Sequence, residues 1–205
     1  MNFSKRTVLI LLLISISFAA CVKELNFDQV NDLEITPTLE SSLVYFEIDS
    51  ERAVEEVLNF YGIDELPPIE LFDSFNYPVR VQLVDTTSID VFNSTFYTKN
   101  LTEADILYQF TNSTITAYDV EVHFLTEDNL IIYDTSFIIE PGSIENPIVS
   151  NQIDNFTNDE LISITNTAKM SVNVTIHVDT NFLYNPEGSL LFKSSGTFYF
   201  LVDEE

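Results

Sequence analysis

The chain has 205 residues, 45% of them hydrophobic, and carries 33 acidic against 8 basic residues, a net charge of −25. A field of that sign repels nucleic acid and anionic lipid surfaces, so DNA and RNA are excluded as expected partners. The 17 phenylalanines and 9 tyrosines suffice for a packed core. Because the chain has one cysteine, no disulfide can form within it, and the fold must depend on that core.

The first twenty residues have the layout of an export signal. Lys5 and Arg6 form a short positive region, and an uncharged stretch from Thr7 to Ser17 follows it. This stretch of about a dozen residues is too short to span a bilayer of about 30 Å as a helix. We therefore expect residues 1–20 to be a removable signal and not a permanent anchor.

The end of this signal resembles that of the bacterial lipoprotein precursors. Ala19 and Ala20 lead directly into Cys21, the single cysteine, although Phe18 stands where the family usually has leucine. In that family the cysteine thiol receives a diacylglycerol and a dedicated peptidase cuts just before it. The resemblance implies that Cys21 is the lipid-modified first residue of the mature protein. Ser17 and Ala19 also fit an ordinary signal cut after Ala19, which would leave Cys21 as a free thiol.

A lipid on the cysteine would also fix where the protein resides. Two or more acyl chains anchor a protein stably, since each buried methylene contributes about 0.8 kcal/mol. Lys23 and Glu24 resemble the short charged export signals of Bacteroidota, and the acidic, Asn-, Thr- and Phe-rich composition is similar to that of outer-membrane lipoproteins of unassigned function from that group. The resemblance implies an outer-membrane anchor and leaves the periplasmic or surface face open. Residues 21–37 are expected to be an acidic tether and residues 38–205 the folded domain.

Strand signals dominate the expected domain: β-branched and aromatic residues alternate with polar ones and are separated by turns. The predicted strands are 39–48, 77–84, 89–98, 105–111, 117–125, 130–139, 170–179 and 189–202. We expect 117–125 and 130–139 to form a hairpin, and the last two strands to pair with each other.

Two helices are expected to interrupt the strands. Ser50 is expected to cap a helix over residues 51–61, whose apolar residues share one face and which Gly62 would end. A shorter helix is expected over residues 158–166, where acidic residues in the first turn favour the positive end of the helix dipole.

The number of strands predicts the fold class. Seven or eight antiparallel strands in one chain indicate a mainly β protein, a two-layer antiparallel β-sandwich with one or two short helices. On strand count alone we expect an immunoglobulin-like arrangement, although the chain has no tryptophan for the Cys–Trp–Cys pattern of that fold.

The two histidines are the side chains to test first for chemistry. His123 and His177 each alternate with apolar residues in a predicted strand, so both are expected on the polar face of a sheet. If the two strands were neighbours, these histidines and Glu121 could meet and bind zinc. Surface histidines without a role are the simpler interpretation, and we predict no metal site and no cofactor.

Catalytic patterns are absent from the sequence. There is no G-x-S-x-G, no H-E-x-x-H, no phosphate loop and no dinucleotide fingerprint. The acidic clusters lack an EF-hand pattern and are expected to be solvated loops. A carboxylate pair for glycoside cleavage, whose members can lie far apart in sequence, stays open. Chance in an Asn- and Thr-rich surface accounts for the five glycosylation sequons, at Asn93, Asn100, Asn112, Asn155 and Asn173.

These observations lead to three hypotheses. The first is a lipid-anchored, non-catalytic cell-envelope protein at the outer membrane that binds another protein or serves as an accessory subunit. The second is a carbohydrate-binding lipoprotein of a glycan-uptake system, which requires a row of two or three exposed tyrosines on one face. The third is an enzyme with an unrecognised carboxylate pair, although we predict no catalytic residues.

Overall fold

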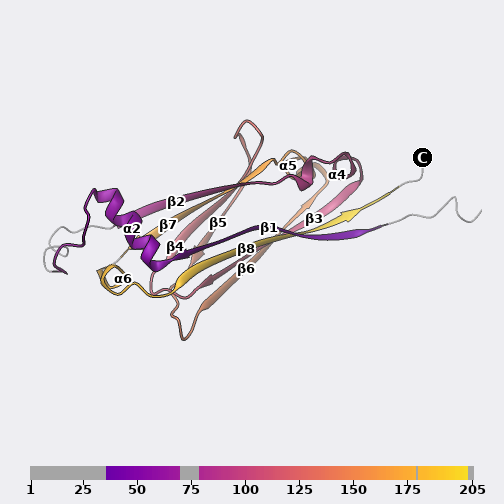
Figure 1. Ribbon diagram of the computed structural model, residues 1–205. Coiled ribbons are helices and arrows are strands. Elements are labelled where there is room, and N and C mark those ends of the chain that lie inside the picture. Colours follow the sequence, from indigo (N-terminus) through magenta and orange to yellow (C-terminus); the bar gives the residue numbers. More distant parts are fainter. Residues whose placement is uncertain (1–35, 70–78, 179, 203–205) are drawn as a thin grey trace, which may run out of the picture. The chain divides into compact units, whose positions relative to one another are not determined.

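The computed structural model describes residues 36–69, 79–178 and 180–202. One compact unit, Thr36–Leu201, contains two four-stranded antiparallel sheets, seen as two layers of strands in Figure 1. The first sheet has the order β1 (Thr38–Asp49), β8 (Ser189–Phe200), β3 (Leu101–Asn112) and β6 (Ile148–Thr157). The second has the order β2 (Val79–Ser88), β7 (Lys169–Val178), β4 (Tyr118–Leu125) and β5 (Ile131–Ile139).

The strand pairing defines a jelly roll. The first strand pairs with the last, the second with the seventh, the third with the sixth and the fourth with the fifth, always antiparallel. A ribbon of such pairs, rolled so that successive pairs fall in opposite sheets, gives this two-sheet architecture. The predicted two-layer sandwich is therefore confirmed. The immunoglobulin-like order is not found, because that fold places its first two strands side by side, whereas β1 and β2 lie in different sheets.

Most predicted strands are observed, and the hairpin of β4 and β5 is confirmed. The expected pairing of the last two strands is wrong, because β7 pairs with β2 and β4, and β8 pairs with β1 and β3. In a jelly roll, strands consecutive in sequence cross from one sheet to the other unless they are joined by a hairpin turn. The short helix α6 (Thr180–Tyr184), which was not predicted, lies on the connection between β7 and β8.

The predicted strand over residues 89–98 is also wrong. The chain there forms a 3₁₀ turn, η2 (Val91–Asn93), and a short helix, α4 (Thr95–Asn100). Ser94 caps that helix, because its side chain accepts a hydrogen bond from the backbone N–H of Tyr97. The 3₁₀ turn buries Phe92 and the helix buries Tyr97, which are 0% and 4% exposed, so aromatic residues that suggested a strand serve a helical connection instead.

The first predicted helix is confirmed as α2 (Ser50–Tyr61), with Gly62 in a left-handed conformation at its end. The capping residue is Asp49 and not Ser50. The backbone N–H of Arg52 donates to the Asp49 carboxylate at 2.7 Å, while Ser50 is the first helical residue and is buried. An aspartate is as good a cap as a serine, so the helix simply begins one residue earlier than expected.

The second predicted helix is confirmed in a broken form. It begins as a 3₁₀ turn, η3 (Asn158–Glu160), and continues as α5 (Leu161–Thr165). Within the described ranges, no helix is both long enough and apolar enough to cross a membrane.

The core fills the space between the central strands of the two sheets. Alternate residues of β3, β8 and β4 are buried, with the intervening residues partly or fully exposed. Phe137 on β5 of the second sheet packs against two rings on β3 of the first, 5.0 Å from the ring of Phe110 and 5.2 Å from that of Tyr108. Such ring pairs contribute about 0.5–1.5 kcal/mol each beyond the burial of their area. Aromatic packing therefore holds the two layers together without a disulfide.

A buried amide fixes the crossing from the first sheet to the second. Asn112, at the end of β3, is 0% exposed. Its amide nitrogen donates to the carbonyls of Thr116 and Glu140 at 2.8 Å, and its amide oxygen accepts from the N–H and hydroxyl of Thr114 at 2.9 Å. The Thr114 hydroxyl also bonds to that of Tyr118, whose pKa burial raises to about 12. The β3–β4 crossing is thus held by a buried polar network in which the Asn112 amide makes all four of its hydrogen bonds.

This network yields a stability prediction. Asn112→Ala leaves the carbonyls of Thr116 and Glu140 without this donor, so we expect the free energy of unfolding to fall by about 2–4 kcal/mol. Urea unfolding of the variant beside the wild type measures the loss. The matched control is Asn146→Ala, at an exposed position, with an expected change within about 0.5 kcal/mol. Equal effects of the two substitutions would contradict the role of Asn112.

Candidate functional site

The outer face of the second sheet carries the candidate side chains. β4 and β7 are neighbours in that sheet. His123 on β4 lies between two buried residues of the alternating pattern, and His177 on β7 follows the buried residues Val172, Val174 and Ile176 in the same alternation. The prediction that both histidines lie on the polar face of a sheet is therefore confirmed.

The register keeps the two histidines apart. His123 lies opposite Ser171 on β7, whereas the backbone N–H of His177 donates to the carbonyl of Ala117 at the start of β4. The stretch from Ala117 to His123 spans about 20 Å at about 3.3 Å per residue. The zinc site that neighbouring strands would have allowed does not form, and no group of three or more His, Cys, Asp or Glu in the described part of the chain could hold a metal ion.

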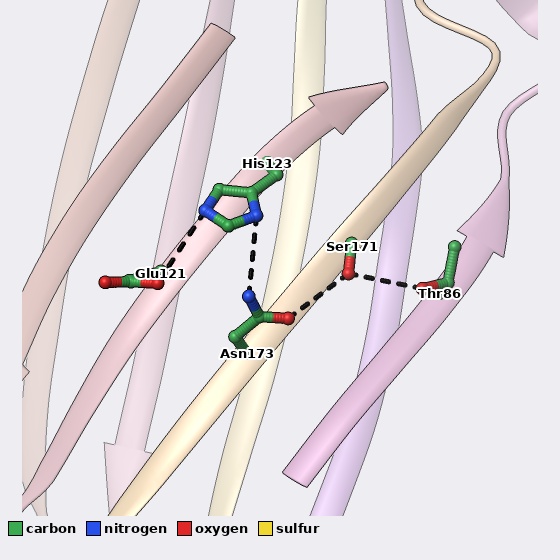
Figure 2. A network of polar contacts seen from close by, with 5 residues as sticks. All are labelled: Thr86, Glu121, His123, Ser171 and Asn173. Carbon is green, nitrogen blue, oxygen red and sulfur yellow. Dashed lines mark hydrogen bonds and ion pairs between the residues drawn. The ribbon is translucent and has the colours of Figure 1, made fainter. Parts of the chain in front are cut away.

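His123 instead belongs to a chain of polar contacts across three strands, drawn in Figure 2. The Thr86 hydroxyl on β2 donates to the Ser171 hydroxyl on β7 at 3.2 Å, and Ser171 donates to the amide oxygen of Asn173 at 3.3 Å. The amide nitrogen of Asn173 lies 3.4 Å from Nδ1 of His123. Nε2 of His123 lies 3.7 Å from the Glu121 carboxylate on the same strand.

The hydrogen bonds of this polar chain all have the same direction, from Thr86 toward Glu121. Because an amide nitrogen can only donate, Nδ1 of His123 must accept, and the ring proton of the neutral imidazole must sit on Nε2. That proton then points toward the carboxylate of Glu121. Ser171 is 6% exposed and the His123 side chain 17%, while the Glu121 side chain is 58% exposed. The chain of contacts is therefore buried in its middle, at Ser171, and exposed to solvent at both ends, at Thr86 and Glu121.

The arrangement limits the chemistry of Ser171. A nucleophilic hydroxyl needs a base within hydrogen-bonding reach, but the Ser171 hydroxyl donates to the Asn173 amide oxygen, which cannot take a proton at ordinary pH. His123 reaches Ser171 only through that amide. The side-chain hydrogen bonds of this network link β2, β7 and β4 and stabilise the register of these three strands.

His177 forms a second, separate pair with a carboxylate. Its Nε2 lies 2.6 Å from the carboxylate of Asp119 on β4, and the two side chains are 36% and 41% exposed. Ion pairs this accessible to solvent contribute about 0–1 kcal/mol to stability. The sheet face thus carries two His–carboxylate pairs at opposite ends of β4.

The two sheets leave a groove along the side where the edge strands β1 and β2 face each other. Its volume is about 450 Å³, within the usual range of small-molecule sites. The lining is Phe46, Glu47, Ile48, Arg52, Glu56, Gln82, Leu83, Val84, Asp85, Val172 and Val174. Arg52 is the one basic residue of this lining, against three carboxylates, so the groove favours no simple anion.

The other side, between β5 and β6, is closed by polar contacts. The Tyr133 hydroxyl donates to the Asp154 carboxylate at 2.7 Å, and the Gln152 amide donates to Asp154 at 2.8 Å and to Thr135 at 3.3 Å. Burial, and then the bond to Asp154, raise the pKa of Tyr133. Tyr108 is fully buried nearby, and burial followed by the charge of Asp154 raises its pKa as well. These contacts place the one charge of β6 on the inside of the sandwich.

The structure does not describe the predicted lipid site, but it does describe the asparagines of the sequons. Cys21, the signal and nearly all of the acidic tether lie outside the described residues. Asn112 is buried with its amide fully bonded, and Asn173 belongs to the polar chain. The sequence did not reveal that polar chain, because it depends on which strands are neighbours and in which register.

Comparisons with known proteins add little. No family model matches the chain, and no curated protein matches it. A protein of Parabacteroides distasonis described as secreted is similar to it in structure, with a TM-score of 0.44, 13% identity, and 58% of this chain and 38% of that chain covered. The infectious bursal disease virus Gx strain gives a TM-score of 0.35 at 8% identity, covering 84% of this chain and 32% of that chain. The structure of Desmodium yellow mottle tymovirus gives a TM-score of 0.29 at 9% identity, covering 84% of this chain and 90% of that chain. The chain spans well under two thirds of the length of the first two.

The direction of the polar chain can be tested by NMR. We expect neutral His123 to carry its proton on Nε2, because Asn173 donates to Nδ1; the ¹⁵N shifts of the ring report this directly. In Asn173→Ala the Nδ1–H tautomer should gain population at His123, since the donor is lost. His177 on β7, which pairs with Asp119 near the start of β4, is the internal control and should not change. A wild-type His123 protonated on Nδ1 would contradict the assigned direction.

Proposed function

We propose that this protein is a lipid-anchored, non-catalytic protein of the cell envelope, attached to the outer membrane through a lipid on Cys21. Its jelly-roll domain would bind another envelope protein or serve as an accessory subunit. One observation carries this proposal: the single cysteine follows two alanines at the end of an uncharged apolar stretch. A lone thiol in an exported protein needs a role, and lipidation gives it one.

The position of the folded domain supports the anchor. The first strand begins at Thr38, so residues 22–37 separate it from Cys21. A segment of that length can span at most about 55 Å when fully extended. Its carboxylates, including Asp28, Asp32 and Glu34, are repelled by anionic headgroups. Such a tether allows the domain to meet partners away from the bilayer.

The carbohydrate hypothesis gains no support from the exposed aromatic side chains, and the enzyme hypothesis gains none from the serine or the histidines. The exposed aromatics Tyr45, Phe60 and Phe96 lie on three different elements, β1, α2 and α4. Across the described ranges they form no row of tyrosines on one face, which the carbohydrate hypothesis requires. For an enzyme, Ser171 lacks an adjacent base and the two histidines do not meet. Binding to a protein partner therefore remains the best supported role.

The net charge suggests the kind of partner surface. An excess of acidic residues speeds encounter with a basic surface and disfavours an acidic one. We propose a partner with a positive docking face, whose capture from membranes in mild detergent should decline as salt is raised. Recovery of the protein alone under low salt would count against a binding role.

The anchor is tested by intact mass and membrane fractionation of the wild type beside Cys21→Ser. We expect the wild type to carry the lipid and to be found in the outer membrane. The serine variant, which has no thiol to acylate, should be soluble. A soluble, unacylated wild type cut after Ala19 would overturn the lipid anchor and favour a free periplasmic or secreted binding protein.

A further inference from the structure

The free edges of the two sheets differ in how well they are protected. An edge strand presents unpaired backbone groups that can pair with another chain, and proteins blunt such edges with bulges or charges. β1 has an extra residue, Leu43, at a break in its register with β8, and acidic residues along its length. β5 has an extra residue, Ile132, opposite β4. β2 carries Arg80 and Asp85.

β6 is the exception among the edge strands of the described chain. It runs for ten residues in unbroken register with β3, from Ile148 to Thr157. Asp154 is its one charged residue, in a protein with 33 acidic residues, and its carboxylate is held inside by Tyr133 and Gln152. Val149 and Ile153 are 54% and 63% exposed. The edge is thus long and regular, and its outward side chains carry no charge and include the apolar Val149 and Ile153.

We propose that two copies of this chain pair through β6, antiparallel and around a twofold axis at Asn151, to form a continuous eight-stranded sheet. The outward residues Val149, Asn151 and Ile153 give the pattern apolar–amide–apolar in both directions. In this register Val149 faces Ile153 of the second copy, and the two Asn151 side chains face each other. A twofold interface requires such self-complementarity.

The charges of the first sheet are compatible with this pairing. The nearest outward carboxylates, Glu103 and Asp105 on β3, both accept hydrogen bonds from Asn155, near the end of β6. With the axis at Asn151, the two Asn155 residues lie about 27 Å apart at about 3.4 Å per residue. That separation is several times the screening length of about 8 Å at physiological salt. Two strongly acidic chains can therefore meet at this edge without opposing their carboxylates.

Single-cysteine crosslinking tests the register. The full chain with Cys21→Ser has no other cysteine, so the test does not depend on lipidation. In an Asn151→Cys variant of that chain the two β-carbons would lie about 4.5–5.5 Å apart, close to disulfide geometry. The matched control is Asn155→Cys. We expect a covalent dimer with the first and none with the second; no dimer, or equal dimer from both, would overturn the proposal.

Charged substitutions on β6 test the proposed dimer by analytical ultracentrifugation. In the double variant Val149→Lys, Ile153→Lys, each lysine at position 149 faces the lysine at position 153 of the other copy. Because this repulsion occurs at two places in the interface, we expect the dissociation constant of the dimer to rise about tenfold or more. Val149→Lys with Ile153→Glu places opposite charges together and should keep the dimer. Both positions are more than half exposed, so the domain should tolerate either pair. A monomeric wild type, or equal weakening by both variants, would overturn self-pairing and leave β6 to a strand of a different protein.

Discussion

The alternation of side chains along the four central strands is the constraint on which the rest of the structure depends. β3 and β8 in one sheet, and β4 and β7 in the other, each turn one apolar face inward. A slip of one residue in any of them would move its whole apolar set to solvent. Because this cost fixes the register of all four strands, it also fixes which polar residues meet on the outer faces, including His123 with Asn173.

The same constraint explains which parts of the fold the sequence predicts. The hairpin strands β4 and β5 are found within one or two residues of their expected bounds, because local alternation and a short turn determine them. Helix α2 ends at Gly62 as expected, since a left-handed residue is a local requirement. The pairing of β7 and β8 with strands distant in sequence is not local, and alternation alone cannot distinguish one apolar partner strand from another.

In the candidate site, too, local features could be predicted from the sequence and contacts between strands could not. Period-two alternation places both histidines on a polar face, and that prediction holds. Whether they meet depends on the register between β4 and β7, which is set by the buried residues on the opposite face and not by the histidines. Thr86 joins the polar chain only because β2 is the other neighbour of β7. No spacing within the sequence contains that information.

β6 was missed because its apolar residues do not alternate with polar ones along the sequence, and this irregularity has a physical cause. At the side of the sandwich the inward positions of an edge strand meet the other sheet's edge and not the core. Asp154 and Gln152 can therefore face inward, where Tyr133 and Thr135 bond to them. The outward positions are then left to Val149 and Ile153, which gain nothing from exposure to water. Closing this side of the sandwich with polar residues thus leaves an apolar outer surface along the same strand, and burial of that surface by a second β6 would account for a pattern that the isolated domain does not require.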